Sequence, residues 1–245
     1  MPKLALKEIF SVSSQSLHLQ ILLPFIIPTV FFIMITSYLF QYLGEGLLLF
    51  QKGGDAVGFV YEWDLFILIA SLIYIILLTF AYNLSSIILR DFATIGKKNY
   101  TNSMKEAYSK TFKVIFVNIM TTIIFLTGIL FYSVHPVLLL MGFLLTPFLF
   151  FAPPSIIIDN LTPFKAIKNS ILLSLHYTLP SFLLFLFSFF VLAIIPLGIS
   201  FLIYQFLSTD LLENFIIYGI PIIEMIFVTY VSILGTVSYL NYRGY

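Results

Sequence analysis

Six long apolar runs are the feature that most constrains what this chain can fold into. A helix needs about 20 mostly apolar residues to cross the hydrocarbon core of a bilayer. The runs extend over residues 21–43, 65–89, 114–133, 136–152, 181–207 and 214–240. A membrane barrel would show short strands of alternating polarity instead. The sequence therefore predicts an all-α integral membrane bundle of six transmembrane helices, forming a single domain over residues 1–245.

The amino-acid composition supports a location in a membrane. Hydrophobic residues make up 60% of the chain and charged residues 9%, whereas a soluble domain has roughly 45–50% and about 25%. This excludes an ordinary soluble enzyme. A formal net charge of +1 argues against a nucleic-acid partner, which would call for a basic surface. With no Cys, disulfides and thiolate chemistry are excluded as well.

The distribution of charge predicts the orientation. Of the 12 Lys and Arg residues, only Lys52 falls in a loop on the side opposite the two termini. Cytoplasmic loops carry an excess of Lys and Arg. We therefore expect a multi-pass protein of the cell membrane with both termini in the cytoplasm.

The shortest run, 136–152, is followed by Pro153-Pro154. Proline removes a backbone donor and clashes with the preceding turn of a helix. The fourth span is accordingly predicted to end there.

Short amphipathic segments precede each pair of spans, at about 4–18, 103–113 and 163–177. The first and third align at a constant offset of 158, with five identities. Lys7, Ile9, Ser16, Leu17 and His18 match Lys165, Ile167, Ser174, Leu175 and His176. This pattern predicts three repeats of an inner-face amphipathic helix plus a transmembrane hairpin. Ser103 with Glu106 has the spacing of a capping box, and Thr162 followed by Pro163 is typical of a helix start.

The basic residues of these segments are expected to lie near anionic lipid head groups at the cytoplasmic interface, each contributing about 1 kcal/mol. They are Lys7, Lys105, Lys110, Lys165 and Lys168. The simpler interpretation is that the segments only anchor and orient the bundle.

The third segment resembles a broad prokaryotic group of polytopic membrane proteins. That group includes the membrane domain attached to some glycerophosphodiester phosphodiesterases and related stand-alone proteins of unknown function. The resemblance covers Pro153-Pro154, Asp159 and the run from Pro163 to Ser170. It departs at Asn160-Leu161, where the pattern has a glycine. The chain leaves no room for the phosphodiesterase barrel, so the resemblance implies no hydrolytic activity.

Glu224 lies near the middle of the last predicted span. A charged acid there costs about 2.5–3.5 kcal/mol on insertion scales, so we expect it to be neutral or paired. One hypothesis makes Glu224 a coupling site for protons or cations, or the partner of a polar substrate. The alternative is a protonated side chain that hydrogen-bonds across a helix interface.

Polar residues also follow two stripes in the inner half of the second and third spans. Thr79, Asn83, Ser86 and Arg90 share the first stripe, and Asn118 and Thr122 share the second. They could line a vestibule open to the cytoplasm, or act as hydrogen bonds between helices, each worth about 0.6 kcal/mol.

A metal site formed by His18, His176 and Asp159 is the weaker hypothesis for these residues, because no sequence pattern sets the distances between them. No catalytic or phosphate-binding motif is present, so we expect no enzyme activity, no metal and no cofactor. The sequence favours a non-enzymatic membrane protein that acts by binding, as a scaffold or as the membrane subunit of a complex, with a protein partner or a second copy of the chain. The alternative is a small-solute or ion transporter or channel that uses Glu224 and the inner polar stripes.

Overall fold

The computed structural model describes residues 5–17, 19–51, 56–95, 100–130, 144–196, 198–199, 201 and 214–244. Within these ranges the chain is helical and contains no β-strand, which confirms the predicted all-α class. The elements are, in chain order, α1 (Leu6–Gln15), α2 (Leu19–Gln51), α3 (Ala56–Ile95), α4 (Tyr100–Leu130), the 3₁₀ turn η1 (Thr146–Leu149), α6 (Ala152–Asp159), α7 (Pro163–His176), α8 (Thr178–Phe189), the π-helical turns η2 (Phe190–Ile194) and η3 (Phe215–Gly219), and α11 (Ile220–Arg243).

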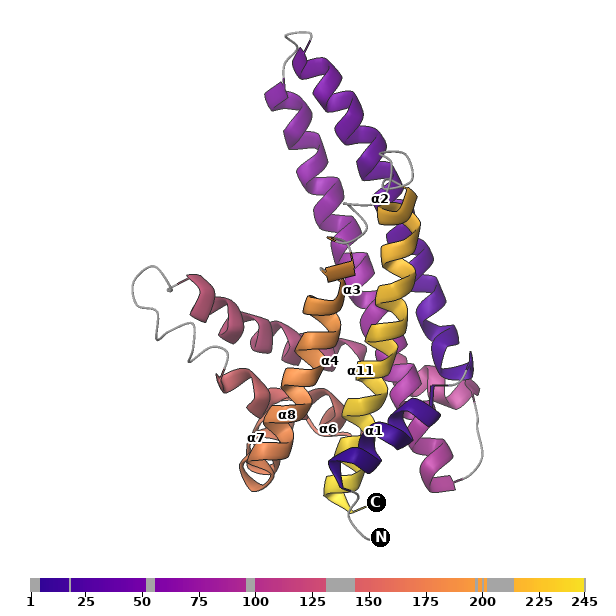
Figure 1. Ribbon diagram of the computed structural model, residues 1–245, viewed down its shortest axis with the longest axis vertical. Helices are drawn as coiled ribbons and strands as arrows, with labels where there is room; N and C mark the ends of the chain where they lie inside the picture. The colour runs from indigo at the N-terminus through magenta and orange to yellow at the C-terminus, as the bar shows by residue number, and fades with distance from the viewer. Residues whose placement is uncertain are drawn as a thin grey trace.

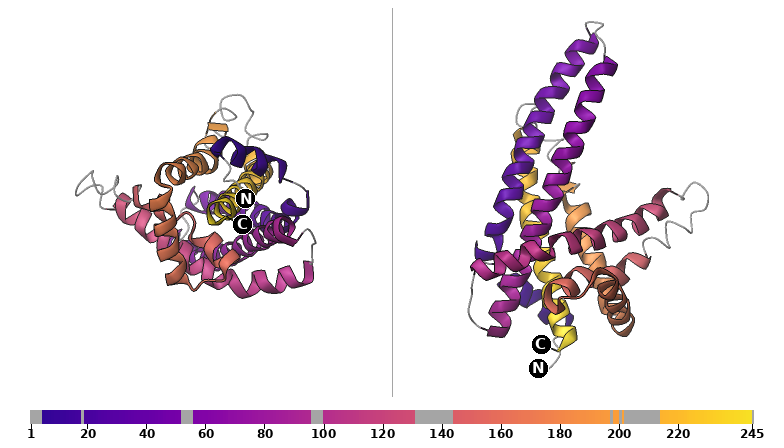
Figure 2. Two further views of the ribbon diagram at one scale, coloured as in Figure 1. Left: turned by 90° about the horizontal axis from the view of Figure 1, so that it is seen from below. Right: turned by 180° about the vertical axis from the view of Figure 1, so that it is seen from behind.

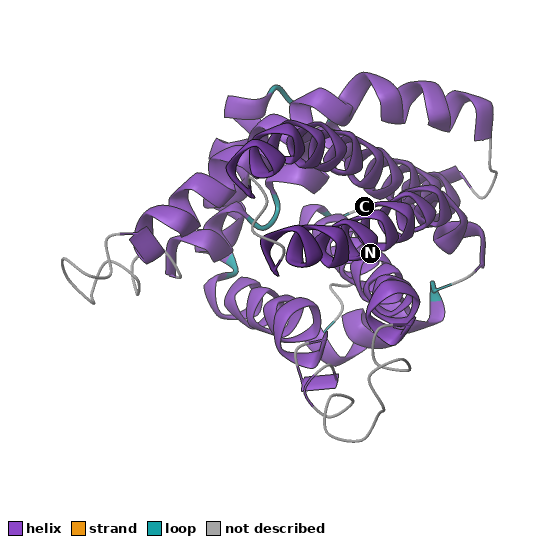
Figure 3. Ribbon diagram, turned by 90° about the horizontal axis from the view of Figure 1, so that it is seen from above, coloured by secondary structure: helices purple, strands orange, loops and turns teal. Residues whose placement is uncertain are grey.

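Three long helices form the axis of the molecule. α2, α3 and α11 contact one another side by side, and the α2–α3 hairpin extends furthest from the two chain ends (Figure 1). α1 packs on α11 at the end of the bundle where both termini lie. The shorter helices α6, α7 and α8, together with α4, lie beside that same half of the bundle (Figure 2). The view along the bundle shows the shorter helices around part of its circumference (Figure 3).

Among the residues that the structure describes, three helices are long and apolar enough to cross a membrane: Gln20–Leu39, Phe66–Thr94 and Phe215–Arg243. They coincide with the predicted runs at 21–43, 65–89 and 214–240. A fourth follows if α7 and α8, which meet at a bend of 110°, are taken as one broken span. The predicted run at 181–207 begins in α8. The parts of the predicted spans at 131–143 and 202–207 lie outside the described residues.

Two local predictions fail. Residues 103–113 do not form a separate helix but run into 114–130 as the continuous helix α4. The chain contains no Gly or Pro between Tyr100 and Thr127, so no backbone signal breaks the helix. Ser103 is therefore inside α4 and does not cap it; its hydroxyl donates to Asp91 Oδ2 at 3.2 Å.

Pro153 and Pro154 begin a helix where they were predicted to end one. They occupy the first turn of α6, where the missing N–H would have no intrahelical partner anyway. The predicted start at Thr162 and Pro163 is confirmed as the first turn of α7. Asn160, which replaces the expected glycine, has a left-handed backbone (φ 52°) and ends α6. Asn is one of the few residues besides Gly that adopts this conformation readily.

Candidate functional site

Charged side chains converge where α3, α4 and α6 meet. Arg90 binds Glu106 in a bidentate pair, with Nη1–Oε1 at 2.7 Å and Nη2–Oε2 at 2.9 Å. Arg90 Nη2 also donates to Asp91 Oδ1 at 2.7 Å. Lys110 pairs with Glu106 and donates to the Ile157 carbonyl oxygen at 2.6 Å. We name the four side chains and this carbonyl the polar junction.

The end of α6 explains why two cations gather here. The last carbonyl groups of a helix have no intrahelical partner and carry a partial negative charge. Both Lys110 and Arg90 donate to the Ile157 carbonyl in the last turn of α6. Glu106 then lies between the two cations and balances them. The junction thus anchors α6 to two neighbouring helices.

The charged groups of the polar junction are shielded from solvent to different degrees, which affects their pKa values. The Lys110 side chain is 4% exposed and that of Glu106 is 31% exposed. The hydrogen bond from Arg90, together with Lys110, lowers the pKa of the Glu106 carboxyl to about 2. Burial lowers the pKa of Lys110, an effect that Glu106 opposes. Glu106 is therefore charged at neutral pH, and the side chains of the polar junction pair with one another and with the α6 carbonyl.

A second polar cluster secures the end of α11. Tyr239 donates to Asp159 Oδ2 at 2.7 Å, and Arg243 pairs with the same oxygen at 2.8 Å. Asn169 Nδ2 donates to the Tyr239 hydroxyl at 2.9 Å and to Ser155 Oγ at 3.0 Å. These contacts connect α6, α7 and α11.

The predicted interface lysines divide into two groups. Lys7, Lys105, Lys165 and Lys168 are exposed. Lys110 is a correction, because it is buried in the polar junction, where the α6 carbonyl and Glu106 replace the lipid head groups expected around it.

The first polar stripe is sealed inside the protein. Thr79, Asn83 and Ser86 are all buried. Asn83 Nδ2 donates to Thr111 Oγ1 at 3.3 Å, while its carbonyl oxygen has no hydrogen-bond partner. Thr236 on α11 donates to Ser86 at 2.9 Å. These contacts match the interhelical hydrogen-bond alternative for Asn83 and Ser86, while Arg90, the fourth residue of the stripe, is part of the polar junction.

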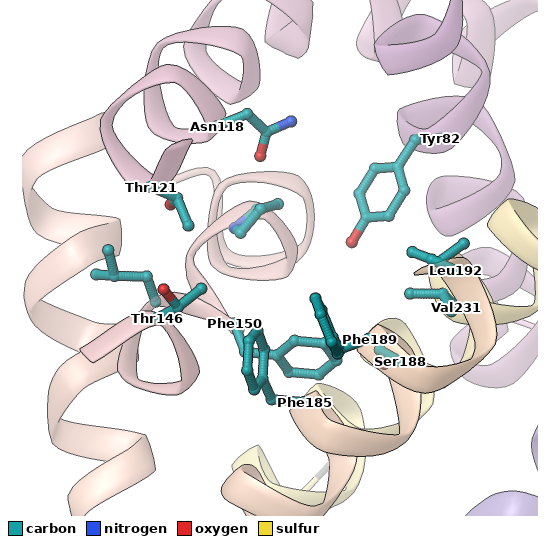
Figure 4. A pocket seen from close by; sticks show the side chains of 12 residues that line it. Tyr82, Asn118, Thr121, Thr146, Phe150, Phe185, Ser188, Phe189, Leu192 and Val231 are labelled. Atoms are coloured by element: carbon teal, nitrogen blue, oxygen red, sulfur yellow. The ribbon is translucent and has the colours of Figure 1, made fainter. Parts of the chain in front are cut away.

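Asn118, in the second stripe, borders a cavity of about 310 Å³ beside the bundle. The cavity has a polar side and an apolar side (Figure 4). Asn118, Thr121, Thr146 and Tyr82 form the polar side, and Phe150, Phe185 and Phe189 lie opposite. The remaining lining residues are Leu149, Pro153, Ser188, Leu192 and Val231. Thr122 is exposed and does not line the cavity; its neighbour Thr121 does.

Glu224 is separate from both the junction and the cavity. It is half-buried on α11 and interacts electrostatically with Tyr74 on α3. Tyr74 precedes Asn83 by nine residues, or about 13 Å along the helix. Within the described residues Glu224 has no hydrogen bond and no ion pair. The structure does not bring Glu224, Asn83 and Asn118 together into one site.

The histidine hypothesis for a metal ion finds no support in the described ranges. His176 is exposed and its ring packs edge-on against Tyr177, while His18 lies outside the described residues. No group of three His, Asp or Glu side chains that could hold a metal occurs in the described part of the chain.

Sequence reasoning missed the polar junction, although one signal for it was available. Glu106 and Lys110 are four residues apart, the spacing at which opposite charges pair on a helix. The contribution of Arg90 had no such signal, because it comes from a different helix and is 16 residues away.

The comparisons with family models, with curated proteins and with solved structures gave no match for this chain.

Proposed function

We propose that this chain is a non-enzymatic polytopic membrane protein that acts by binding, as a scaffold or as the membrane subunit of a complex. The observation that carries the proposal is the α2–α3 hairpin. Its helices have 33 and 40 residues, which is about 50 and 60 Å at 1.5 Å per residue. The hydrocarbon core is about 30 Å thick. The hairpin extends past the other helices (Figure 1) and provides a projecting element for a partner.

Two further features support the binding role. The charged groups of the polar junction are paired with one another and with a backbone carbonyl, so none is left to act as acid or base. The exposed lysines belong to α1, α4 and α7, and these helices lie in the half of the molecule that holds both termini (Figure 1). This agrees with the proposed cytoplasmic face and its anionic lipids.

The finer architecture belongs to the same proposal: six spans, built as three repeats with both termini inside. α2 begins at Leu19 and α8 begins at Thr178, so the two helix starts differ by 159 residues, close to the repeat offset of 158. This coincidence supports the first and third repeats. Membership in the group that resembles the phosphodiesterase membrane domain is part of the proposal too.

Purification from native membranes in polymer nanodiscs tests the binding role. The full chain should retain a stoichiometric protein partner or a second copy. A variant in which residues 44–62 are replaced by a short Gly-Ser linker should lose that partner while keeping its thermal unfolding temperature. Recovery of a monodisperse monomer in every preparation would contradict the proposal.

One observation favours the second candidate, a small-solute or ion transporter. Glu224 has no ion pair within the described residues, and an acid at membrane depth is a functional candidate. Flux into proteoliposomes should then fall when Glu224 is replaced by Gln. An unchanged rate would remove Glu224 from the mechanism.

A further inference from the structure

Among the described residues, none that lines the cavity beside α4 is charged. Its polar atoms are the amide of Asn118 and the hydroxyl groups of Tyr82, Thr121, Thr146 and Ser188. A phosphate or carboxylate head group would find no cation there to pair with. The lining therefore favours an uncharged ligand that carries hydroxyl or carbonyl groups.

Asn118 is the polar group that needs a partner. The Tyr82 hydroxyl is hydrogen-bonded to Ser86, and Thr121 and Ser188 donate to carbonyl groups of their own helices. The Asn118 amide makes no hydrogen bond within the described residues, although it offers two donors and an acceptor. The Asn118 side chain is exposed, and an unpaired amide in apolar surroundings is unfavourable, so a ligand that pairs with Asn118 is stabilised.

The opposite side of the cavity suits an alkyl chain. Phe150, Phe185 and Phe189 face the polar side across the cavity (Figure 4). At about 310 Å³, the volume is at the lower end of the range for ligand pockets, about 300–1,000 Å³. It has room for one medium-length chain, and a two-chain phospholipid would extend beyond it.

We propose that this cavity binds a neutral single-chain amphiphile of the monoacylglycerol type. Its hydroxyl and ester groups hydrogen-bond to Asn118, and its chain lies against Phe185 and Phe189. The site depends on the proposed membrane location but not on a protein partner, so loss of ligand and loss of partner are measured separately.

Tryptophan quenching tests this assignment. Trp63 is the only Trp of the chain, so replacing it with Phe gives a silent background. In that background Phe189→Trp places an indole in the cavity, and Phe190→Trp, whose native side chain is 51% exposed, is the matched control outside it. A medium-chain monoacylglycerol brominated at the end of its chain is titrated into nanodiscs. Quenching should saturate for Phe189→Trp and rise linearly for Phe190→Trp.

Two substitutions on α4 then test the hydrogen bond. Asn118→Leu should raise the half-saturating mole fraction about tenfold, which corresponds to the loss of one hydrogen bond to the ligand. Thr122→Leu, on the same helix but outside the cavity, should leave the titration unchanged. Linear quenching at both Trp positions, or an unchanged titration for Asn118→Leu, would overturn the assignment.

Two further measurements make the outcome decisive. Native mass spectrometry of the unsubstituted protein should show one retained monoacylglycerol, which tests the site even where the Trp variants fail to fold. A lysophosphatidate that competes as well as the monoacylglycerol would overturn the neutral head group. Asn118→Leu should still retain any protein partner, because the ligand site and the α2–α3 hairpin are separate features.

Discussion

The two halves of α3 have opposite surroundings. From Phe66 to Ile76 most side chains are apolar and exposed; Leu72, for example, is 52% exposed. From Thr79 to Leu89 nearly every residue is buried, and this half contains Asn83, two serines and a threonine. In a soluble protein the apolar half would be the buried one.

The difference shows what holds these helices together. Lipid tails are as apolar as the side chains of the exposed half, so burying those side chains would gain little. Small and polar side chains instead allow close helix packing and interhelical hydrogen bonds. The buried half of α3 makes such bonds to α4 at Asn83 and to α11 at Ser86. The cohesion of the bundle is therefore concentrated in the half that contains the polar junction.

The largest expected effect comes from breaking the polar junction. Glu106→Gln leaves Lys110 and Arg90 without their shared counter-charge, and removing one partner of a buried ion pair costs about 3–5 kcal/mol. Partial exposure of Glu106 places the expected loss toward the lower figure. Thermal unfolding in detergent measures it. The control is Glu8→Gln on α1, whose exposed carboxylate accepts a hydrogen bond from the Ala5 N–H. Equal melting temperatures for the two variants would contradict a stabilising junction.

The same junction predicts a loss of stability in acid. The pKa of Glu106 is about 2 in the folded chain and 4.5 in the unfolded one. The stability contributed by this group is therefore fully present above pH 4.5 and is lost as the pH falls toward 2. Glu106→Gln lacks that contribution at every pH. The difference in melting temperature between the natural chain and Glu106→Gln should shrink over this range, and a constant difference would contradict the lowered pKa.

A comparison of matched truncations tests the two halves of α3 directly. Ile88 is 2% exposed and Ile76 is 38% exposed. Ile88→Ala should destabilise the chain by about 2 kcal/mol, because it removes packing contacts and leaves a cavity. Ile76→Ala should cost less than about 0.5 kcal/mol, because lipid fills the space. Equal losses in thermal unfolding would show that the exposed half also has a protein partner.

The sequence predictions that succeed concern features that each helix determines by itself. Helix class and the helices at 21–43, 65–89 and 214–240 follow from hydropathy alone, since a bilayer requires long apolar helices whatever their neighbours are. The start of α7 follows from the local chemistry of Thr162 and Pro163. Such features need no knowledge of what each helix packs against.

The predictions that fail concern residues whose roles depend on the neighbouring helices. By its position in the sequence Lys110 resembles an interface lysine. In the fold, however, the carbonyl end of α6 faces Lys110 and accepts its hydrogen bond. Pro153 and Pro154 end or begin a helix depending on the residues before them, and both positions are chemically permitted. Asn118 belongs to the cavity, and Asn83 does not, because of how α4 lies against α3 and α8. Side-chain roles set by crossing helices are not encoded within one helix.

A smaller effect is expected at the Asn83–Thr111 pair. Thr111→Val removes the hydroxyl to which the buried Asn83 amide nitrogen donates, and should cost about 1–2 kcal/mol. Adding Asn83→Leu removes the unpaired group, so the double variant should regain most of that loss. Additive losses in the double variant would show that the amide was not the source of the cost.

The smallest effect separates hydrogen bonding from close packing between α3 and α11. Thr236→Val removes the hydrogen bond to Ser86 and should cost about 0.6 kcal/mol, the average for such contacts in membrane bundles. Gly235→Ala adds a methyl group 3.7 Å from the Tyr82 hydroxyl oxygen and 3.8 Å from the Phe150 ring, both ordinary contacts. It should therefore be neutral within a few tenths of a kcal/mol, helped by the better helix propensity of Ala. A larger loss for Gly235→Ala than for Thr236→Val in thermal unfolding would mean that close approach of the two helices, more than hydrogen bonding, holds the buried half of α3 in place.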